Sequence, residues 1–147
     1  MVFTCKFFDE LSVGELYDLL ALRSEVFVVE QNCVYQDPDQ KDRRAWHCQG
    51  MHEEELAACT RIFDLHQSYD GYLSIGRVIV SPRFRGHGFG RQIMEYSIGE
   101  CYRLFGKHPI KIGAQSYLEK FYGELGFRTE GPEYLEDGIP HKIMVLP

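Results

Sequence analysis

The 147-residue sequence has no hydrophobic run near the roughly 18 apolar residues needed to cross a bilayer. Its first residues, MVFTCKFFDE, lack the basic start and apolar stretch of a signal peptide. Its five cysteines are odd in number and include no CxxC pair, so neither a disulfide framework nor a zinc knuckle is indicated. No His, Cys and Asp cluster has metal-ligand spacing. We therefore expect a cytoplasmic protein with reduced thiols, no metal and no membrane partner.

The sequence also has no excess of basic over acidic residues. Sixteen Lys and Arg stand against twenty-two Asp and Glu, a formal charge of −6, which argues against a nucleic-acid partner. The acid is unevenly placed, because residues 1–60 hold twelve acids and five bases whereas residues 71–94 hold no acid and four arginines. One short stretch of an acidic chain is therefore positive.

The composition, 44% hydrophobic and 26% charged, fits a globular chain that closes its own core, and we predict a single domain over residues 1–147. The apolar spacing predicts an α+β fold around one mixed sheet. Capping boxes at Ser12–Glu15 and Ser116–Glu119 predict the starts of two helices, and a third follows a glycine-rich segment. The expected strands are residues 2–8, 45–51, 56–63, 73–80, 111–115, 127–130 and 142–146.

The glycine-rich segment carries the clearest chemical signal. The residues Arg85-Gly-His-Gly-Phe-Gly-Arg91 lie between a β-branched strand ending at Val80 and a predicted helix. Glycines let a ligand approach the backbone, and free amides at a helix N-terminus favour negative charge. The segment therefore predicts an anion-binding loop.

Two common anion-binding loops do not fit this spacing. A dinucleotide-binding G-x-G-x-x-G motif needs glycine where Arg91 stands, and it follows the first strand of a βαβ unit. A Walker loop ends in Gly-Lys-Ser/Thr, which is absent. Neither a dinucleotide fold nor a P-loop is indicated.

The segment Val78-Ile-Val-Ser-Pro-Arg-Phe-Arg-Gly-His-Gly-Phe-Gly90 resembles motif A of the GNAT N-acetyltransferases. Gln115-Ser-Tyr-Leu-Glu-Lys-Phe-Tyr-Gly-Glu-Leu-Gly-Phe127 resembles their motif B, with Gln115 where asparagine is usual and Leu118 where alanine is usual. Further blocks resemble the ElaA-like branch of the family across nearly the whole chain: residues 22–32, 35–39, 76–81, 113–115 and 136–141.

The resemblance implies a GNAT fold, with a mostly antiparallel central sheet flanked by helices, and acetyl-coenzyme A as cosubstrate. In this family the amides of the glycine loop hold the pyrophosphate, and the splayed strand before it offers amides to the pantetheine arm and the thioester oxygen. Carried over to matching positions, these contacts fall on Val78, Ile79, Val80, Arg85, Gly86, His87, Gly88, Phe89, Gly90, Arg91 and Gln115.

The resemblance also implies catalytic candidates. Tyr122 stands at the motif B tyrosine, whose hydroxyl in the family often protonates the departing thiolate, and packing alone is the alternative. A general base must accept the proton of an incoming ammonium, and Glu30, His47 and His141 are the candidates. The loop acids Asp37, Asp39 and Asp42 would either attract a cationic substrate or be solvated. Arg23 and Arg77 interrupt apolar segments, which favours structural ion pairs.

The resulting hypothesis is an acetyl-coenzyme A dependent N-acetyltransferase acting on a primary amine of a small molecule or peptide. A coenzyme A binding or regulatory module without transfer activity is one alternative. The other comes from Arg23-x-x-x-Phe27 and its following acids, which resemble acyl-homoserine-lactone synthases, enzymes that use S-adenosylmethionine and acyl carrier protein. A homodimer stays open, because GNAT folds often dimerise.

Overall fold

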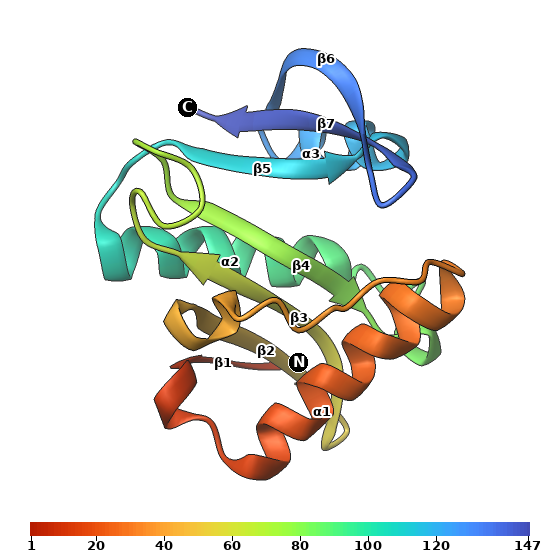
Figure 1. Cartoon of the computed structure of the whole chain (residues 1–147). Coiled ribbons are helices and arrows are strands. Elements are labelled where there is room, and N and C mark those ends of the chain that lie inside the picture. Colours follow the sequence, from red (N-terminus) through yellow and green to blue (C-terminus); the bar gives the residue numbers. More distant parts are fainter.

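The computed structural model describes residues 1–147 as two antiparallel sheets with helices on both sides (Figure 1). The first sheet has the order β1-β2-β3-β4, formed by β1 (Val2–Phe7), β2 (Trp46–His52), β3 (Glu55–Phe63) and β4 (Ser74–Val80). The second has the order β5-β7-β6, formed by β5 (Ile110–Gln115), β6 (Arg128–Glu136) and β7 (Ile139–Leu146). The predicted α+β class is confirmed.

The two sheets meet at one end of β4 and β5 only. A parallel bridge joins Leu73 to Ile110, and the Lys111 amide donates to the Leu73 carbonyl at 2.9 Å. Beyond that bridge the two strands diverge, as the green and cyan ribbons show (Figure 1). The expected single mixed sheet is therefore split, and the split opens a wedge between β4 and β5.

Two long helices cover opposite faces of the first sheet. Helix α1 (Val13–Arg23) begins at the predicted capping box, where the Glu15 amide donates to Ser12 Oγ at 3.0 Å. It continues as a wider π-helical segment, Ser24–Glu30, and packs through Leu19, Leu22 and Val26 against Cys59 and Ile79. None of the helices combines the length and the hydrophobicity that a bilayer crossing requires.

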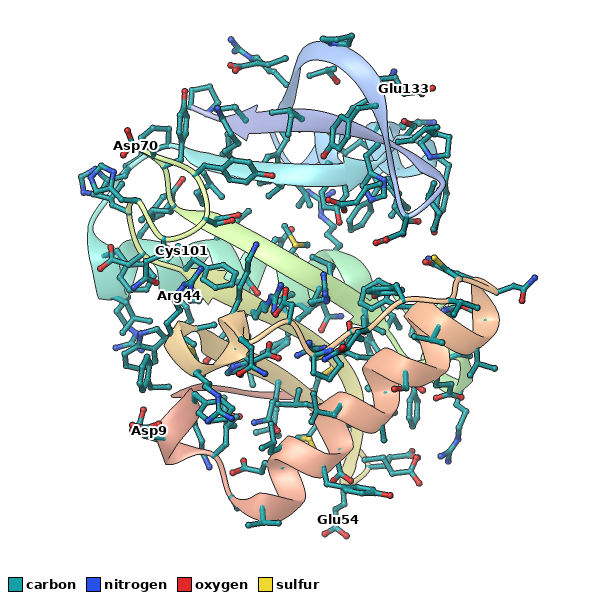
Figure 2. The ribbon with its side chains drawn as sticks, viewed as in Figure 1. Asp9, Arg44, Glu54, Asp70, Cys101 and Glu133 are labelled. Carbon is teal, nitrogen blue, oxygen red and sulfur yellow. The ribbon has the colours of Figure 1, made fainter.

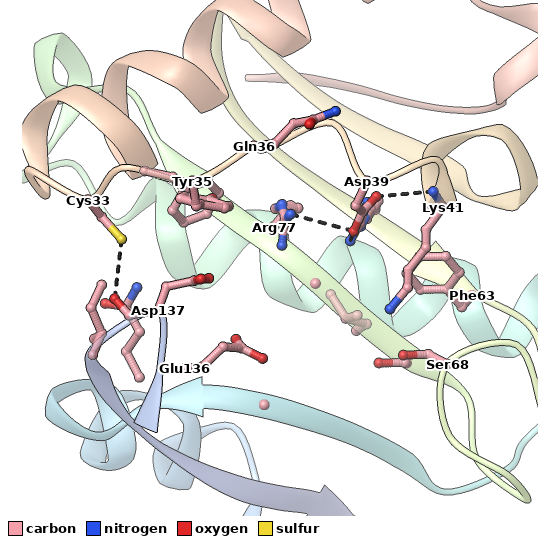
Figure 3. A pocket seen from close by; sticks show the side chains of 18 of the residues that line it. Cys33, Tyr35, Gln36, Asp39, Lys41, Phe63, Ser68, Arg77, Glu136 and Asp137 are labelled. Carbon is pink, nitrogen blue, oxygen red and sulfur yellow. Dashed lines mark hydrogen bonds and ion pairs between the residues drawn. The ribbon is translucent and has the colours of Figure 1, made fainter. Parts of the chain in front are cut away.

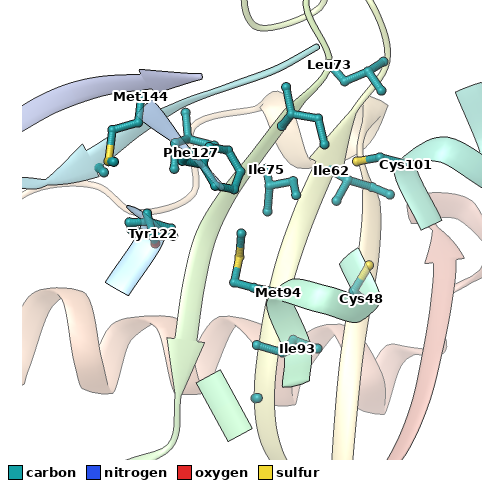
Figure 4. Packing of buried hydrophobic residues seen from close by; sticks show 14 residues of the cluster. Cys48, Ile62, Leu73, Ile75, Ile93, Met94, Cys101, Tyr122, Phe127 and Met144 are labelled. Carbon is teal, nitrogen blue, oxygen red and sulfur yellow. The ribbon is translucent and has the colours of Figure 1, made fainter. Parts of the chain in front are cut away.

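Helix α2 (Phe89–Phe105) lies on the other face and forms the main core (Figure 4). Ile93 and Met94 are fully buried against strands of the first sheet, and Tyr122, Phe127 and Met144 extend the same cluster toward the second sheet. Four of the five cysteines are buried, and all five are free thiols. By contrast, the charged residues Asp9, Glu54, Asp70 and Glu133 lie at the periphery, and Cys101 lies inside (Figure 2).

Two local predictions are wrong. Ser116 begins a 3-10 turn, Ser116–Leu118, rather than capping a helix, and its buried hydroxyl has no partner. Helix α3 (Glu119–Glu124) starts later, and Glu119 instead contacts Thr129 and Lys142.

The closing strands are longer than predicted, because only two residues connect them. Asp137 and Gly138 both have positive φ, 51° and 77°, as a type I′ hairpin turn requires. The predicted loop around Pro140 is therefore part of β7.

Candidate active site

The wedge between β4 and β5 contains three adjoining cavities. One, of about 370 Å³, lies beside the glycine loop and is lined by Glu30, Val78, Arg85 and Tyr122 among others. A second, of about 360 Å³, lies on the opposite side and is lined by the loop after α1, the start of β4 and the β6–β7 turn. A third, of about 90 Å³, shares Val78 and Tyr122 with the first and Arg77 and Gln115 with the second. The three cavities therefore adjoin one another in a row along the wedge, which we call the passage.

The glycine loop presents unpaired amides at the start of α2. Gly88 has a φ of 75°, a left-handed conformation that favours glycine, and it forms the N-cap of this 17-residue helix. None of the backbone amides of residues 86–91 has a hydrogen-bond acceptor in the protein. With the helix dipole behind them, these donors fit a bound diphosphate. His87 and Phe89 lie at the same turn with their rings 5.5 Å apart.

Strand β4 carries a bulge before the end that leads to the glycine loop. Cys59 pairs with Ile79 but Arg61 pairs with Gly76, so β4 has one extra residue there, and Arg77 has a φ of 49°. The Ser81 amide donates to Ala57 of β3 at 2.7 Å. Because amides alternate along a strand, those of Val78 and Val80 face the wedge and that of Ile79 faces β3.

Tyr122 lies at the junction between the glycine-loop cavity and the connecting passage. Its ring is held edge-on between Phe121 and Phe127, at 5.0 and 5.9 Å. Burial raises the pKa of its phenol well above 10, and no hydrogen bond offsets that effect. The hydroxyl therefore carries its proton at neutral pH and releases it less readily than a solvated tyrosine does.

Glu30 and Arg85 form a two-pronged ion pair across the mouth of the glycine-loop cavity. The two terminal nitrogens of the Arg85 guanidinium, Nη1 and Nη2, each donate to one carboxylate oxygen of Glu30 at 2.7 Å. The hydrogen bonds from Arg85 lower the pKa of Glu30, which reduces its affinity for a proton. Glu30 therefore lies on the glycine-loop side of the passage rather than on the side of the second cavity.

The two candidate histidines line no cavity. His47 is buried in β2, with Nε2 3.0 Å from the Asp42 carbonyl, and burial lowers its pKa. His141 is buried in β7, where Nδ1 contacts the Ile139 carbonyl at 2.7 Å and Nε2 lies 3.4 Å from Glu136. Glu136 does line the second cavity. His141 therefore does not line the passage itself but contacts Glu136, which does.

The loop acids are neither solvated nor free to attract a substrate. Arg23 binds Asp37 and Asp42, at 2.7 and 2.8 Å, and Arg77 binds Asp37 at 2.8 Å. Arg61 binds Asp42 and Asp39, at 2.9 and 2.7 Å. The predicted ion pairs of Arg23 and Arg77 are confirmed, and this arginine–aspartate network fixes the loop beside β4.

Gln115, which stands where motif B usually has asparagine, contacts Gln31, a residue distant in the sequence. Its side-chain amide and that of Gln31 exchange hydrogen bonds of 3.2 and 3.3 Å across the wedge. Two residues further on, the Cys33 thiol donates to the Asp137 carbonyl at 3.3 Å (Figure 3). The segment after α1 therefore bridges to the second sheet and forms a wall of the passage.

Sequence reasoning missed several residues of the second cavity, including Gln31, Lys41, Tyr69 and Glu136. They lie in four separate segments, and although Gln31 and Glu136 fall in blocks that resemble the ElaA-like branch, nothing in those blocks marks a cavity. Only the Asp137-Gly138 pair, a strong two-residue hairpin signal, could have placed Glu136 at a strand end.

Comparison with known proteins gives the family. A family model of the acetyltransferase (GNAT) domain matches residues 25–147. The chain is 44% identical over 135 residues to protein ElaA of Escherichia coli K12, covering 90% of this chain and 88% of that protein. A solved acyl-CoA N-acyltransferase from Pseudomonas aeruginosa, 39% identical, superposes with a TM-score of 0.93 and covers 100% of both chains.

A more distant structure shares the fold. It is N-acetylglutamate synthase from Neisseria gonorrhoeae, complexed with coenzyme A and N-acetyl-glutamate, at 16% identity and a TM-score of 0.69. That match covers 99% of this chain and 35% of the synthase. On the extent of the family match and the identity to ElaA, the chain belongs to the GNAT acetyltransferase family.

Proposed function

We propose that the protein transfers an acetyl group from acetyl-coenzyme A to a primary amine of a small molecule or peptide. The observation that carries the proposal is the passage itself. It joins a cavity beside unpaired helix amides to a second cavity, with a protonated tyrosine at the junction. A two-substrate transfer requires access to one reacting centre from two sides.

Coenzyme A fits the glycine-loop side. The pyrophosphate would accept hydrogen bonds from the free amides of residues 86–91, and the pantetheine arm would follow the wedge-facing edge of β4. The largely apolar walls of this cavity, which include Val26, Leu118 and Phe121, suit that arm. Arg85 lies close enough to contribute charge, although Glu30 already neutralises part of it.

Acetyl-coenzyme A supplies the activated thioester carbonyl. The amides of Val78 and Val80 both face the wedge, where one would donate to that carbonyl oxygen and the other to the pantetheine arm. A preorganised donor to that oxygen is worth about 3 kcal/mol of transition-state stabilisation. The amine attacks, the N–C bond forms and the C–S bond breaks. Tyr122 donates its proton to the departing sulfur, and the phenol recovers it from solvent afterwards.

The proton of the amine leaves on the acceptor side. Glu136 is a carboxylate exposed to the second cavity, and His141 lies against it. We assign Glu136, through water, as the acceptor of that proton, with His141 as a positioning residue. The ion pair with Arg85 makes Glu30 a weaker base and places it on the cofactor side.

The experiment is a calorimetric titration with acetyl-coenzyme A followed by a panel of amines with free-thiol detection. Saturable binding together with amine-dependent thiol release supports the proposal. Absence of coenzyme A binding would refute it. Tight binding without thiol release from any amine would instead favour a coenzyme A binding module.

A further inference from the structure

The second cavity separates charges of opposite sign along its length. Glu136, the last residue of β6, and Asp137, in the β6–β7 turn, lie at one end. Register places this turn beside the connecting passage, because Tyr134 pairs with His141 and His141 pairs with Gln115. Figure 3 shows the two acids near the arrowhead of β5, and Lys41, Phe63 and Ser68 at the opposite end. The acidic end is therefore the end next to Tyr122 and the expected thioester.

The far end is lined by hydrogen-bond donors. Lys41 forms no ion pair, and its side chain extends beside Phe63 into the cavity (Figure 3). Arg61 lies over the Phe63 ring at 5.2 Å, and its buried Nε has no hydrogen-bond partner. Lys111 does not line the cavity, because its Nζ lies over the ring of Tyr72 at 4.0 Å and is 5.7 Å from the ring of Tyr69, a cavity residue.

The carboxylates near this far end do not cancel its charge. Asp37, Asp39 and Asp42 are fully engaged by Arg23, Arg61 and Arg77, three anions against three cations. Lys41, which lines the cavity, is additional to that balanced network. The far end is therefore positive, whereas the end beside the passage is negative.

We propose that the acceptor is an amine that carries an anionic group, a carboxylate or phosphate, at its other end. Glu136 and Asp137 attract its ammonium group to the thioester, and Lys41 binds the anion. This inference rests on the proposed acetyl transfer and specifies its substrate class. Transfer forms the amide N–C bond, breaks the C–S bond and releases coenzyme A as a thiol, with the amine proton passing to Glu136.

The test compares amines of matched length that differ in the distal group. The probes are γ-aminobutyrate and ε-aminocaproate against n-butylamine and n-hexylamine, assayed by free-thiol release. A hydrogen bond to a charged group predicts a kcat/KM about tenfold higher for the amino acids. Lys41→Met should lower kcat/KM for the two amino acids about tenfold, to the level of the alkylamines. Lys107→Met, at an exposed site outside the cavities, is the matched control and should behave as wild type.

Equal kcat/KM for the two probe classes, or an equal effect of Lys41→Met on both, would overturn the inference. If no probe releases thiol, binding of the same probes to the coenzyme A-loaded protein is measured by saturation-transfer NMR. Binding of ε-aminocaproate that Lys41→Met weakens supports the polar cavity even though the transfer proposal fails. Equal binding of n-hexylamine, or no binding of any probe, overturns it.

Discussion

At the scale of single residues, burial decides which groups can exchange protons. Tyr122 is held protonated by its apolar surroundings, and the ion pair with Arg85 holds Glu30 ionised. Both groups line the same cavity, but their pKa values are shifted in opposite directions: Tyr122 keeps its proton and Glu30 loses its proton. Of the two, only Tyr122 carries a proton at neutral pH.

Replacing Tyr122 with Phe should lower kcat at least tenfold, within the range for loss of a positioned acid, and leave the coenzyme A dissociation constant within about twofold. The ring packing is kept, because Phe fills the same space between Phe121 and Phe127. Thiol release measures kcat and calorimetry measures affinity. Tyr17→Phe, at a 73% exposed position on α1, is the control. An unchanged kcat would remove Tyr122 from the mechanism.

At the scale of elements, two interruptions of regular structure make the site. The bulge in β4 turns Arg77 toward the aspartate loop, where Asp37 binds it. The glycine turn before α2 leaves the first amides of the helix unpaired. Both features disrupt local hydrogen bonding, and both lie where a ligand is proposed to bind.

Replacing Gly88 with Ala should lower the free energy of unfolding by about 1 kcal/mol, because alanine at positive φ is strained. It should also weaken coenzyme A binding severalfold by displacing the loop amides. Gly99→Ala in the same helix is the matched control, since Gly99 lies in open space at ordinary helical φ. That control should stabilise by about 1 kcal/mol. Urea unfolding and calorimetry distinguish the two, and equal behaviour of the variants would contradict the prediction.

At the scale of the whole molecule, buried charge sets the response to pH. Burial lowers the pKa of His47, so its protonation favours the unfolded chain. Burial alone would raise the pKa of Asp42, but hydrogen bonds and charge from Arg23 and Arg61 outweigh that effect and lower it. The pKa of Asp39 is lowered in the same way, chiefly by Arg61. All three groups bind protons more readily when the chain is unfolded.

The free energy of unfolding should therefore fall in two stages as the pH decreases. The first stage begins near pH 6.5, the ordinary pKa of a histidine side chain. The second begins near pH 4, where the aspartates of the unfolded chain become protonated. His47→Gln should flatten the first stage and leave the second. Urea titrations between neutral and acid pH measure both. A stability that stays constant from neutral pH to pH 5 in the wild-type protein would contradict the His47 assignment.

The sequence by itself determined the family, the order of nearly all elements and the glycine loop, because each depends on contiguous residues: apolar periodicity, a capping box at Ser12 and the Arg85–Arg91 spacing. Only the tertiary structure decided the split of the sheet after Leu73, the Gln31–Gln115 bridge and the second cavity. It also decided the role of the loop acids Asp37, Asp39 and Asp42, for which the sequence offered either attraction of a cationic substrate or solvation. In the structure they form ion pairs with arginines. Their arginine partners lie 14 to 40 residues away, so the path of the chain, rather than any local pattern, brings the opposite charges into contact.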